Sequence, residues 1–458
     1  MITYIIIFKR QHYIYMPFKY TSRHNILYIL AFCISLLSCT KSSNDNPSQE
    51  PQIRRTIIAY IIADNNLNAN FQSDVNEMIT GSNDLPEDCR LVAYVDPSNG
   101  TPYIIEIKDG KREVLKNFNE FYSISADSMT NILQWIADKY PADEYALIMG
   151  GHGTGPLIEN DTIKTTYFTK LYAYGPDETG SSAGTSTKKW LNIPSFATVL
   201  SNIKDKKKNS ELHFEYIFFD CCCMQTAEVA YELRNYTDYI IAPASETPAN
   251  GAPYEHIVPL LGTDKELIGK SIIDNYITYT SWNGTGGIAI STVKTSEMED
   301  LLDATHEALL SIREKKKANN EWSESGIWDG TQWVKDKITL NKKNCIYYYR
   351  ETILTSLSPI LHDMKNIMRS NLSADTYEKW LTQFNKAIVY SYCPNGSNIP
   401  WLTALNIEFG LFTINEDTYG GMSMIIPSDI YDKDYDNLNS TMYGLEWANK
   451  VGWHELGW

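Results

Sequence analysis

The sequence predicts an α/β protein built around a mainly parallel sheet, and two observations support this fold class. Short, largely apolar runs lie at 56–63, 145–149, 214–219 and 239–244, with Glu215 as their one charged residue. Runs of this kind are typical of strands that are covered on both faces. Predicted helices separate the runs, and such alternation of strands and helices favours parallel pairing through crossover connections.

The first 38 residues have the order of parts of an export signal. Basic residues precede an apolar run at 26–37, and this run is too short for a transmembrane helix. We therefore expect a signal peptide over residues 1–38. Met16 begins such a signal better than Met1 does, because the stretch between them adds a second apolar patch without a function.

The end of this signal resembles a bacterial lipobox, in which the signal is cleaved and the new N-terminal cysteine is acylated. Leucines and then Ser38 precede Cys39, so we expect lipidation at Cys39 and anchoring to a bacterial membrane, in the periplasm or at the cell surface. The alternative is a plain signal peptide followed by a chance cysteine. Residues 39–53 are rich in Ser, Asn, Pro and Gln, which predicts a flexible tether.

The charge balance argues against nucleic acid as a partner. The formal net charge is −16, and residues 1–38 contain four of the 40 Lys and Arg residues but none of the 56 Asp and Glu residues. The chain after residue 38 therefore carries 36 basic and 56 acidic residues, a formal charge of −20. This balance disfavours binding to a phosphate backbone.

Local patterns predict the remaining elements in chain order. Further strands are expected at 90–95, in a hairpin of 103–107 and 111–115, and at 287–293, 403–413 and 421–426. Helices are expected at 65–80 after a cap at Asp64 or Asn65, and at 127–139, from Pro194, 226–234, 264–281, 295–314, 350–370 and 376–388.

Three segments between these elements are expected to be irregular or exposed. Residues 156–190 contain few apolar anchors and predict a long exposed loop, a feature typical of lids, binding loops and processing sites. The lysine run at 204–208 predicts a solvated helix end. Residues 245–254 are rich in turn formers and are expected to form one wall of a site at the end of the preceding strand.

The chemistry is expected beyond the carboxyl ends of the parallel strands, where loops diverge and ligands bind. His152 follows the run at 145–149 within Gly-Gly-His-Gly, and Cys222 follows the run at 214–219 as the middle of three adjacent cysteines. A cysteine acts as a nucleophile in its thiolate form, which a nearby histidine supports. Cys222 and His152 are therefore a candidate nucleophile and base, with the amides of Gly153 and Cys222 as candidate oxyanion donors.

The same residues have plainer interpretations. A glycine-framed histidine is also typical of a tight turn, and the cysteines could be buried apolar filler, as we expect for Cys89, Cys345 and Cys393. A metal site of His152 with the three cysteines is disfavoured, because structural zinc prefers ligands two to four residues apart. We predict no metal ligands and no required cofactor.

At these two motifs the chain resembles the clostripain family of cysteine peptidases, in the clan of caspases, legumain and gingipains. The family pattern is a strand ending in His-Gly, then a strand ending in Asp-Ala-Cys-Leu-Met and a helix with a glutamate. Here the second part is Asp220-Cys221-Cys222-Cys223-Met224, followed by Glu228. The resemblance therefore matches Cys222 with the nucleophile, and it extends over nearly everything after residue 54.

The resemblance implies a caspase-like three-layer α/β sandwich, with a catalytic core at 54–262 and a C-terminal α+β extension at 263–458 that completes the sheet and adds helices. It implies a secreted cysteine endopeptidase that cleaves protein or peptide substrates after Arg or Lys. That preference falls on Asp220, whose carboxylate suits a guanidinium. The alternative for Asp220 is a cap for the helix that follows Met224.

The resemblance also bears on regulation. Family members are often zymogens that are cut between the His and Cys strands, so Lys164, Lys170, Lys188 and Lys189 are candidate self-cleavage sites. Some relatives need calcium and others do not, which leaves a calcium requirement open. A second class of function also stays open: a surface lipoprotein of this fold that binds peptides or partners without turnover.

Overall fold

A central β-sheet positions the candidate residues in the computed structural model of the protein. The structure describes residues 52–156, 174–177, 189–279, 288–328, 330–353, 356–393, 415, 417–431 and 438–458. The expected signal peptide, Cys39, Lys164, Lys170, Lys188 and the expected strand at 403–413 lie outside the described residues. Within the described ranges, no helix combines the length and the apolar character that a bilayer crossing needs.

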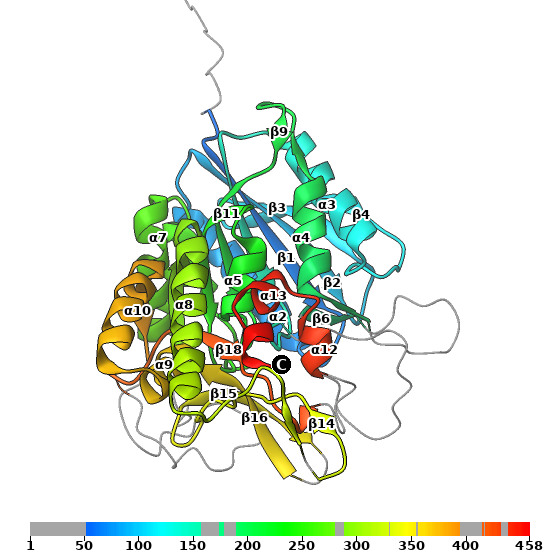
Figure 1. The fold of residues 1–458 in the computed structure, drawn as a ribbon. Coiled ribbons are helices and arrows are strands. Elements are labelled where there is room, and N and C mark those ends of the chain that lie inside the picture. Colours follow the sequence, from blue (N-terminus) through cyan, green and yellow to red (C-terminus); the bar gives the residue numbers. More distant parts are fainter. Residues whose placement is uncertain are drawn as a thin grey trace, which may run out of the picture. The chain divides into compact units, whose positions relative to one another are not determined.

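In the described part of the chain this sheet has nine strands, in the order β17-β12-β11-β10-β5-β1-β2-β3-β4 (Figure 1). The central strands are parallel: β1 (Arg55–Ala63), β2 (Cys89–Pro97), β5 (Glu144–Gly150), β10 (Phe214–Asp220) and β11 (Thr237–Pro243). Antiparallel strands extend both edges: β3 (Tyr103–Lys108), β4 (Lys111–Asn117), β12 (Ile290–Lys294) and β17 (Ile388–Tyr392). The predicted parallel centre and the predicted hairpin are confirmed.

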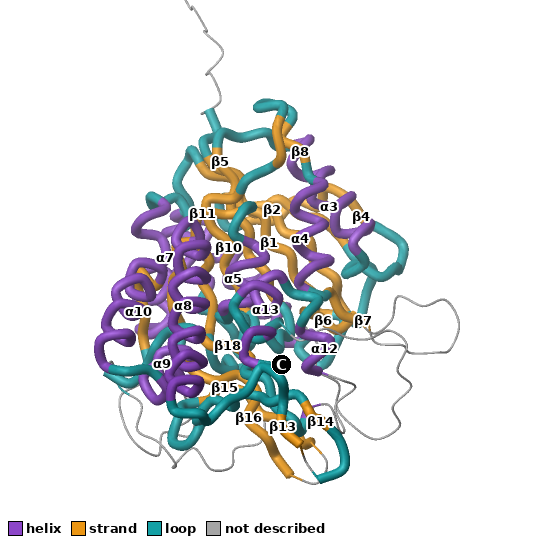
Figure 2. Tube along the Cα trace, viewed as in Figure 1, coloured by secondary structure: helices purple, strands orange, loops and turns teal. Residues whose placement is uncertain are grey.

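Helices cover both faces of this sheet. Side chains along each central strand alternate between the two faces, so each face has its own apolar core. In β1, Ile58 and Tyr60 belong to one core, whereas Ile57 and Ala59 belong to the other. The first core is closed by α3 (Ala126–Lys139), α4 (Ile193–Asn202), α5 (Ala227–Leu233), α8 (Met298–Ala318) and α10 (Ala374–Ala387), as Figure 2 shows. The second core is closed by α2 (Asn68–Gly81), α6 (Tyr254–Ile257) and α7 (Lys265–Tyr279). This is the predicted three-layer sandwich.

The predicted helix at 350–370 is wrong over most of its length. The chain forms β15 (Tyr347–Ile353) and β16 (Ser356–Asp363) there, and the helix α9 covers only Met364–Asn371. The cause is local, because residues 347–353 are rich in aromatic and β-branched side chains, which favour strands. Asp363 then starts the helix, since its carboxylate accepts the backbone N–H of Asn366 at 2.9 Å.

Strand β18 (Ser423–Ile425) completes a three-stranded sheet in the order β15-β16-β18. This sheet joins the C-terminal part to the core, because the Ser423 amide donates to the carbonyl of Gln225 at 3.1 Å. The Glu228 carboxylate, buried in α5, accepts the amide of Ile425 at 2.8 Å. The family glutamate therefore ties the helix after the cysteines to the C-terminal sheet.

Two expected irregular segments contain strands instead. The lysine run lies in a small hairpin, β8 (Lys204–Asp205) with β9 (Ser210–Glu211), because the Asp205 side chain accepts the amide of Lys207 and closes the turn. Within the expected exposed loop, β6 (Tyr174–Asp177) is buried and pairs with β7 (Lys189–Leu191). The signal for β6 was the single residue Tyr174, whose ring packs under Gly151 and whose hydroxyl donates to the carbonyl of Gly150 at 2.7 Å.

Candidate active site

Strand register brings His152 and Cys222 together. Strands β5 and β10 are parallel neighbours, and their last pair in register is Gly150 with Asp220. His152 and Cys222 each follow that pair by two residues. They lie on the two segments that leave the sheet at the same edge, after β5 and after β10. Contact between the two segments is close, because a Cβ atom on Gly153 would lie 2.5 Å from the carbonyl oxygen of Cys222. Only glycine fits at residue 153.

The His152 ring is oriented by a residue that sequence reasoning did not assign. His152 Nε2 lies 2.8 Å from Asn66 Oδ1, and Asn66 lies in the loop between β1 and α2. The amide oxygen can only accept, so Nε2 carries a proton and a neutral ring has its lone pair on Nδ1. The sequence signal for this partner was the Asp-Asn-Asn run directly after the first buried strand.

The Cys222 thiol is partly buried and is hydrogen-bonded to the loop after β11. The amide of Thr247 donates to Sγ at 3.3 Å, and the Thr247 hydroxyl oxygen lies 3.5 Å from Sγ. Burial raises the pKa of Cys222 to about 11, and the charge of Glu246 adds to this, while the two contacts from Thr247 lower it. In this arrangement the thiol is the stable form at neutral pH.

The two flanking cysteines are less accessible than Cys222. Cys221 and Cys223 are fully buried, and burial raises both pKa values well above the ordinary range. The Cys221 thiol donates to the carbonyl of Met149 at 2.9 Å, and Cys223 has a positive φ of 60°. The greater exposure of Cys222 therefore comes from the turn that follows β10, which ends at Asp220. The predicted burial of Cys89, Cys345 and Cys393 is confirmed.

Gly153 and Cys222, whose amides are expected to stabilise an oxyanion, are in close backbone contact. Gly153 forms an isolated antiparallel bridge with Tyr174. The hydrogen bond of that bridge runs from the amide of Gly175 to the carbonyl of His152 at 3.2 Å, so it does not use the Gly153 amide. Gly153 and Cys222 are held against each other by the contact described above.

Asp220 does not cap the following helix, so that alternative is wrong. The cap of α5 is Thr226, whose hydroxyl accepts the amide of Val229 at 3.1 Å. Asp220 is instead buried and accepts three hydrogen bonds. The donors are the Ala252 amide at 3.0 Å and the hydroxyls of Tyr254 and Tyr276 at 3.0 and 3.4 Å.

A second buried carboxyl group lies next to Asp220 and had no role in the sequence analysis. Asp74 of α2 is 1% exposed, and neither of its oxygens has a hydrogen-bond partner among the described residues. A Cβ atom on Gly251 would lie 2.9 Å from an oxygen of Asp74 and 3.1 Å from one of Asp220. Burial, and then the charge of Asp220, raise the pKa of Asp74 to about 10. Burial also raises the pKa of Asp220, so the two carboxyl groups titrate as a pair.

A cavity of about 340 Å³ lies beside this acidic pair. It is lined by Ala69, Asn70, Ser73, Glu77, Asn250, Gly251, Pro253 and Tyr279. Gly251, from the predicted wall at 245–254, is common to the cavity and to the contact with both carboxyl groups.

Lys189 is the one expected self-cleavage residue within the described part of the chain. Its backbone begins β7 and is opposite Asp177 of β6. A peptide bond paired in a β-ladder is less accessible to a protease than one in an open loop.

Comparison with known proteins gives consistent results. The family model described as the clostripain family matches residues 59–458. Clostripain from Hathewaya histolytica is 27% identical over 219 residues, which are 43% of this chain. The match spans 38% of the length of that relative.

Solved structures show the same fold. A secreted C11 cysteine protease from Bacteroides thetaiotaomicron, in complex with an irreversible peptide inhibitor, aligns with a TM-score of 0.65 at 23% identity, covering 88% of this chain and 99% of that chain. An inactive zymogen C11 protease from Parabacteroides distasonis aligns with a TM-score of 0.63 at 23% identity, over 88% of this chain and 99% of that chain. The chain described here belongs to the clostripain family of peptidases.

Proposed function

We propose that the protein is a cysteine endopeptidase that cleaves peptide bonds after Arg or Lys. The observation that supports this proposal is the register of β5 and β10, because His152 and Cys222 each follow the Gly150–Asp220 pair by two residues. Membership of the clostripain family supports the class of reaction. The catalytic roles of Cys222 and His152 are part of the proposal.

The reaction begins from the thiol and not from a preformed thiolate. His152 Nδ1 takes the Cys222 proton as Sγ attacks the carbonyl carbon of the substrate, and the amides of Gly153 and Cys222 donate to the oxyanion. The protonated His152 then gives its proton to the leaving amine, which leaves an acyl-enzyme. Water, activated by His152, hydrolyses the thioester and restores the thiol. Asn66 keeps the ring oriented through Nε2.

In this proposal, the carboxyl groups of Asp74 and Asp220 select substrates with Arg or Lys before the cleaved bond. Asp220 lies two residues before the nucleophile, so a substrate side chain that enters beside Cys222 passes toward it. A guanidinium or ammonium group near Asp220 and Asp74 favours the ionised form of both carboxyl groups. Two carboxylates then face one cation, and the planar guanidinium can hydrogen-bond to both.

We further propose that the chain is exported and lipid-anchored at Cys39, and that it activates itself by cleavage within 156–190. The signal and the lipobox pattern support the first proposal, and the basic residues of the segment support the second. The backbone pairing of Lys189 favours Lys164 and Lys170 as the cleaved residues, because the bond after Lys188 also includes the amide of Lys189. The sequence requires no cofactor for the reaction, and activation by calcium remains to be measured with and without a chelator.

Hydrolysis of fluorogenic peptides that end in Arg, Lys or norleucine tests the proposal. We expect cleavage after Arg and Lys and at least about tenfold slower cleavage after norleucine. Cys222→Ala and His152→Ala should abolish it, whereas Cys223→Ala, at a buried neighbouring thiol, should retain it. Equal activity in Cys222→Ala and the wild type would exclude this nucleophile. A protein that binds the basic peptides without cleaving them would instead be a binding module.

A further inference from the structure

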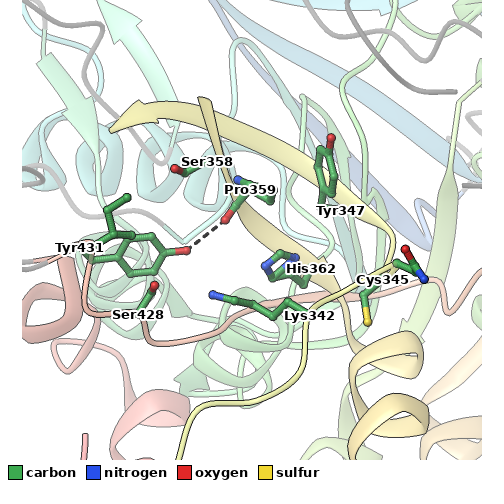
Figure 3. Close-up of a pocket in the computed structure, with 10 residues that line it drawn as sticks. Lys342, Cys345, Tyr347, Ser358, Pro359, His362, Ser428 and Tyr431 are labelled. Carbon is green, nitrogen blue, oxygen red and sulfur yellow. Dashed lines mark hydrogen bonds between the residues drawn. The ribbon is translucent and has the colours of Figure 1, made fainter. Parts of the chain in front are cut away.

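A second cavity, of about 340 Å³, lies in the C-terminal part of the chain and belongs to no step of the proposed reaction (Figure 3). Three segments form its walls: residues 342–347 leading into β15, strand β16, and residues 428–431. The Tyr431 hydroxyl donates to the carbonyl of Pro359 at 3.1 Å, which joins the third segment to β16. The cavity is therefore built between segments that are already linked.

The His362 ring in this cavity has unmet hydrogen-bonding capacity. His362 is 2% exposed, and neither ring nitrogen has a hydrogen-bond partner within the described residues. A neutral imidazole has one donor and one acceptor, and a buried polar atom without a partner costs about 1–3 kcal/mol. Native proteins rarely keep such a group unless a ligand or water satisfies it.

The cavity also contains an ammonium group without an acidic partner. Among the residues that the structure describes, no carboxylate forms an ion pair with Lys342, whose Nζ lies 5.9 Å from the centre of the Tyr431 ring. Burial lowers the pKa of Lys342, and burial together with Lys342 lowers the pKa of His362 to about 3. In Figure 3 the Lys342 side chain extends toward Tyr431 and Ser428, next to the His362 ring.

The charge of the lining is unusual for this chain. The lining residues are Lys342, Asn344, Cys345, Tyr347, Ser358, Pro359, His362, Ser428, Ile430 and Tyr431, with no Asp or Glu among them. The whole chain has 56 acidic residues against 40 basic ones. A cavity with a cation, an imidazole and two serine hydroxyls, but no carboxylate, favours an anion with an apolar body.

We propose that this cavity binds the carboxylate of a small organic monoanion. Lys342 Nζ and a ring nitrogen of His362 hold the carboxylate, and the Tyr347 and Tyr431 rings contact the apolar body. A single ammonium matches one negative charge, whereas a phosphate dianion usually requires more cations or several backbone amides. Binding satisfies the buried imidazole and pairs the ammonium.

The position of this site relates it to the candidate active site. Side chains alternate along β16, so Leu361 and His362 point to opposite sides of the strand. Leu361 faces the His152 loop, since a Cβ atom on Gly155 would lie 3.3 Å from Leu361 Cδ1. The cavity is therefore separated from that loop by one strand.

Calorimetric titration of the full chain carrying Cys222→Ala tests the site without interference from peptide cleavage. The probe is 3-phenylpropionate, the matched neutral control is 3-phenylpropionamide, and inorganic phosphate is a third ligand. We expect one-site binding of the carboxylate and at least about tenfold weaker binding of the amide and of phosphate, which is the scale of one charge-assisted hydrogen bond.

Three variants connect the binding to the cavity. Lys342→Met keeps the length of the side chain and should weaken carboxylate binding at least about tenfold. His362→Phe keeps a ring and should also weaken it, whereas Lys343→Met, at an exposed residue outside the lining, should leave it unchanged. If His362→Phe does not fold, carboxylate binding by Lys342→Met alone tests the proposal. No binding of the carboxylate, equal binding of the amide, preferred binding of phosphate, or unchanged binding in Lys342→Met would each overturn the proposal.

Discussion

The reactivity of Cys222 toward iodoacetamide should rise steadily with pH in the unliganded protein. With a pKa of about 11, the thiolate fraction at pH 7 is about 10⁻⁴, roughly a hundredfold below that of a thiol with the ordinary pKa of 9.0. Since only the thiolate reacts, the rate constant should increase about tenfold per pH unit between pH 6 and 9. Mass spectrometry of the modified peptide gives the rate, and Cys222→Ala gives the background from the other thiols.

Glu246→Gln tests the electrostatic part of this pKa. Removing the charge should lower the pKa of Cys222 and accelerate alkylation at pH 7, because a nearby carboxylate disfavours the thiolate. The rate of alkylation at pH 7 should rise by less than about a hundredfold. Burial is the larger cause of the raised Cys222 pKa, and it persists in the variant. Glu246→Asp keeps the charge and is the matched control. A plateau in the rate below pH 8 would refute the reasoning, because it would mean a preformed pair of thiolate and imidazolium.

The remaining predictions concern selectivity, backbone space and acid stability. Asp220→Asn and Asp74→Asn should each lower kcat/KM for Arg peptides at least about tenfold and leave a norleucine peptide unaffected, whereas a purely structural role for Asp74 would leave the ratio between the two substrates unchanged. Gly153→Ala should abolish hydrolysis and lower the free energy of unfolding by about 1–3 kcal/mol, because the added Cβ meets the Cys222 carbonyl at 2.5 Å; a melting curve and activity like those of the wild type would contradict this. The folded-state pKa of His362, about 3, lies below its ordinary 6.5, so its contribution to stability is complete above pH 6.5 and is lost as the pH falls toward 3. Urea unfolding should show a loss of about 2 kcal/mol between pH 8 and pH 5 that is absent from His362→Phe.

Much of the fold could be predicted because its signals are local. The buried strands that became β1, β5, β10 and β11 are largely apolar runs, and the helices between them follow from periodicity and capping residues. Where the prediction failed, at 350–370, two local signals competed. A helix was expected there, but aromatic and β-branched residues favoured the strands β15 and β16.

Part of the candidate site could also be predicted, because parallel strands end at one edge of a sheet. That rule predicts that His152 and Cys222 lie at the same edge, and the register of β5 with β10 agrees with it. The partner of the imidazole, Asn66, could not be assigned, since its role depends on how the loop after β1 turns toward that edge.

The family, the α/β architecture and the two candidate catalytic residues could be predicted from the amino-acid sequence, because they depend on runs and motifs that are contiguous in the chain. The groups that surround these two residues depend on three-dimensional packing and could not be predicted. Asp74 and Asp220 come from a helix and a strand far apart in sequence, and their raised pKa values follow from burial that no local pattern encodes. The same holds for the cavity around Lys342 and His362, since three separate segments create it. Burial and charge act through space, so the chemistry of both places depends on packing and not on sequence order.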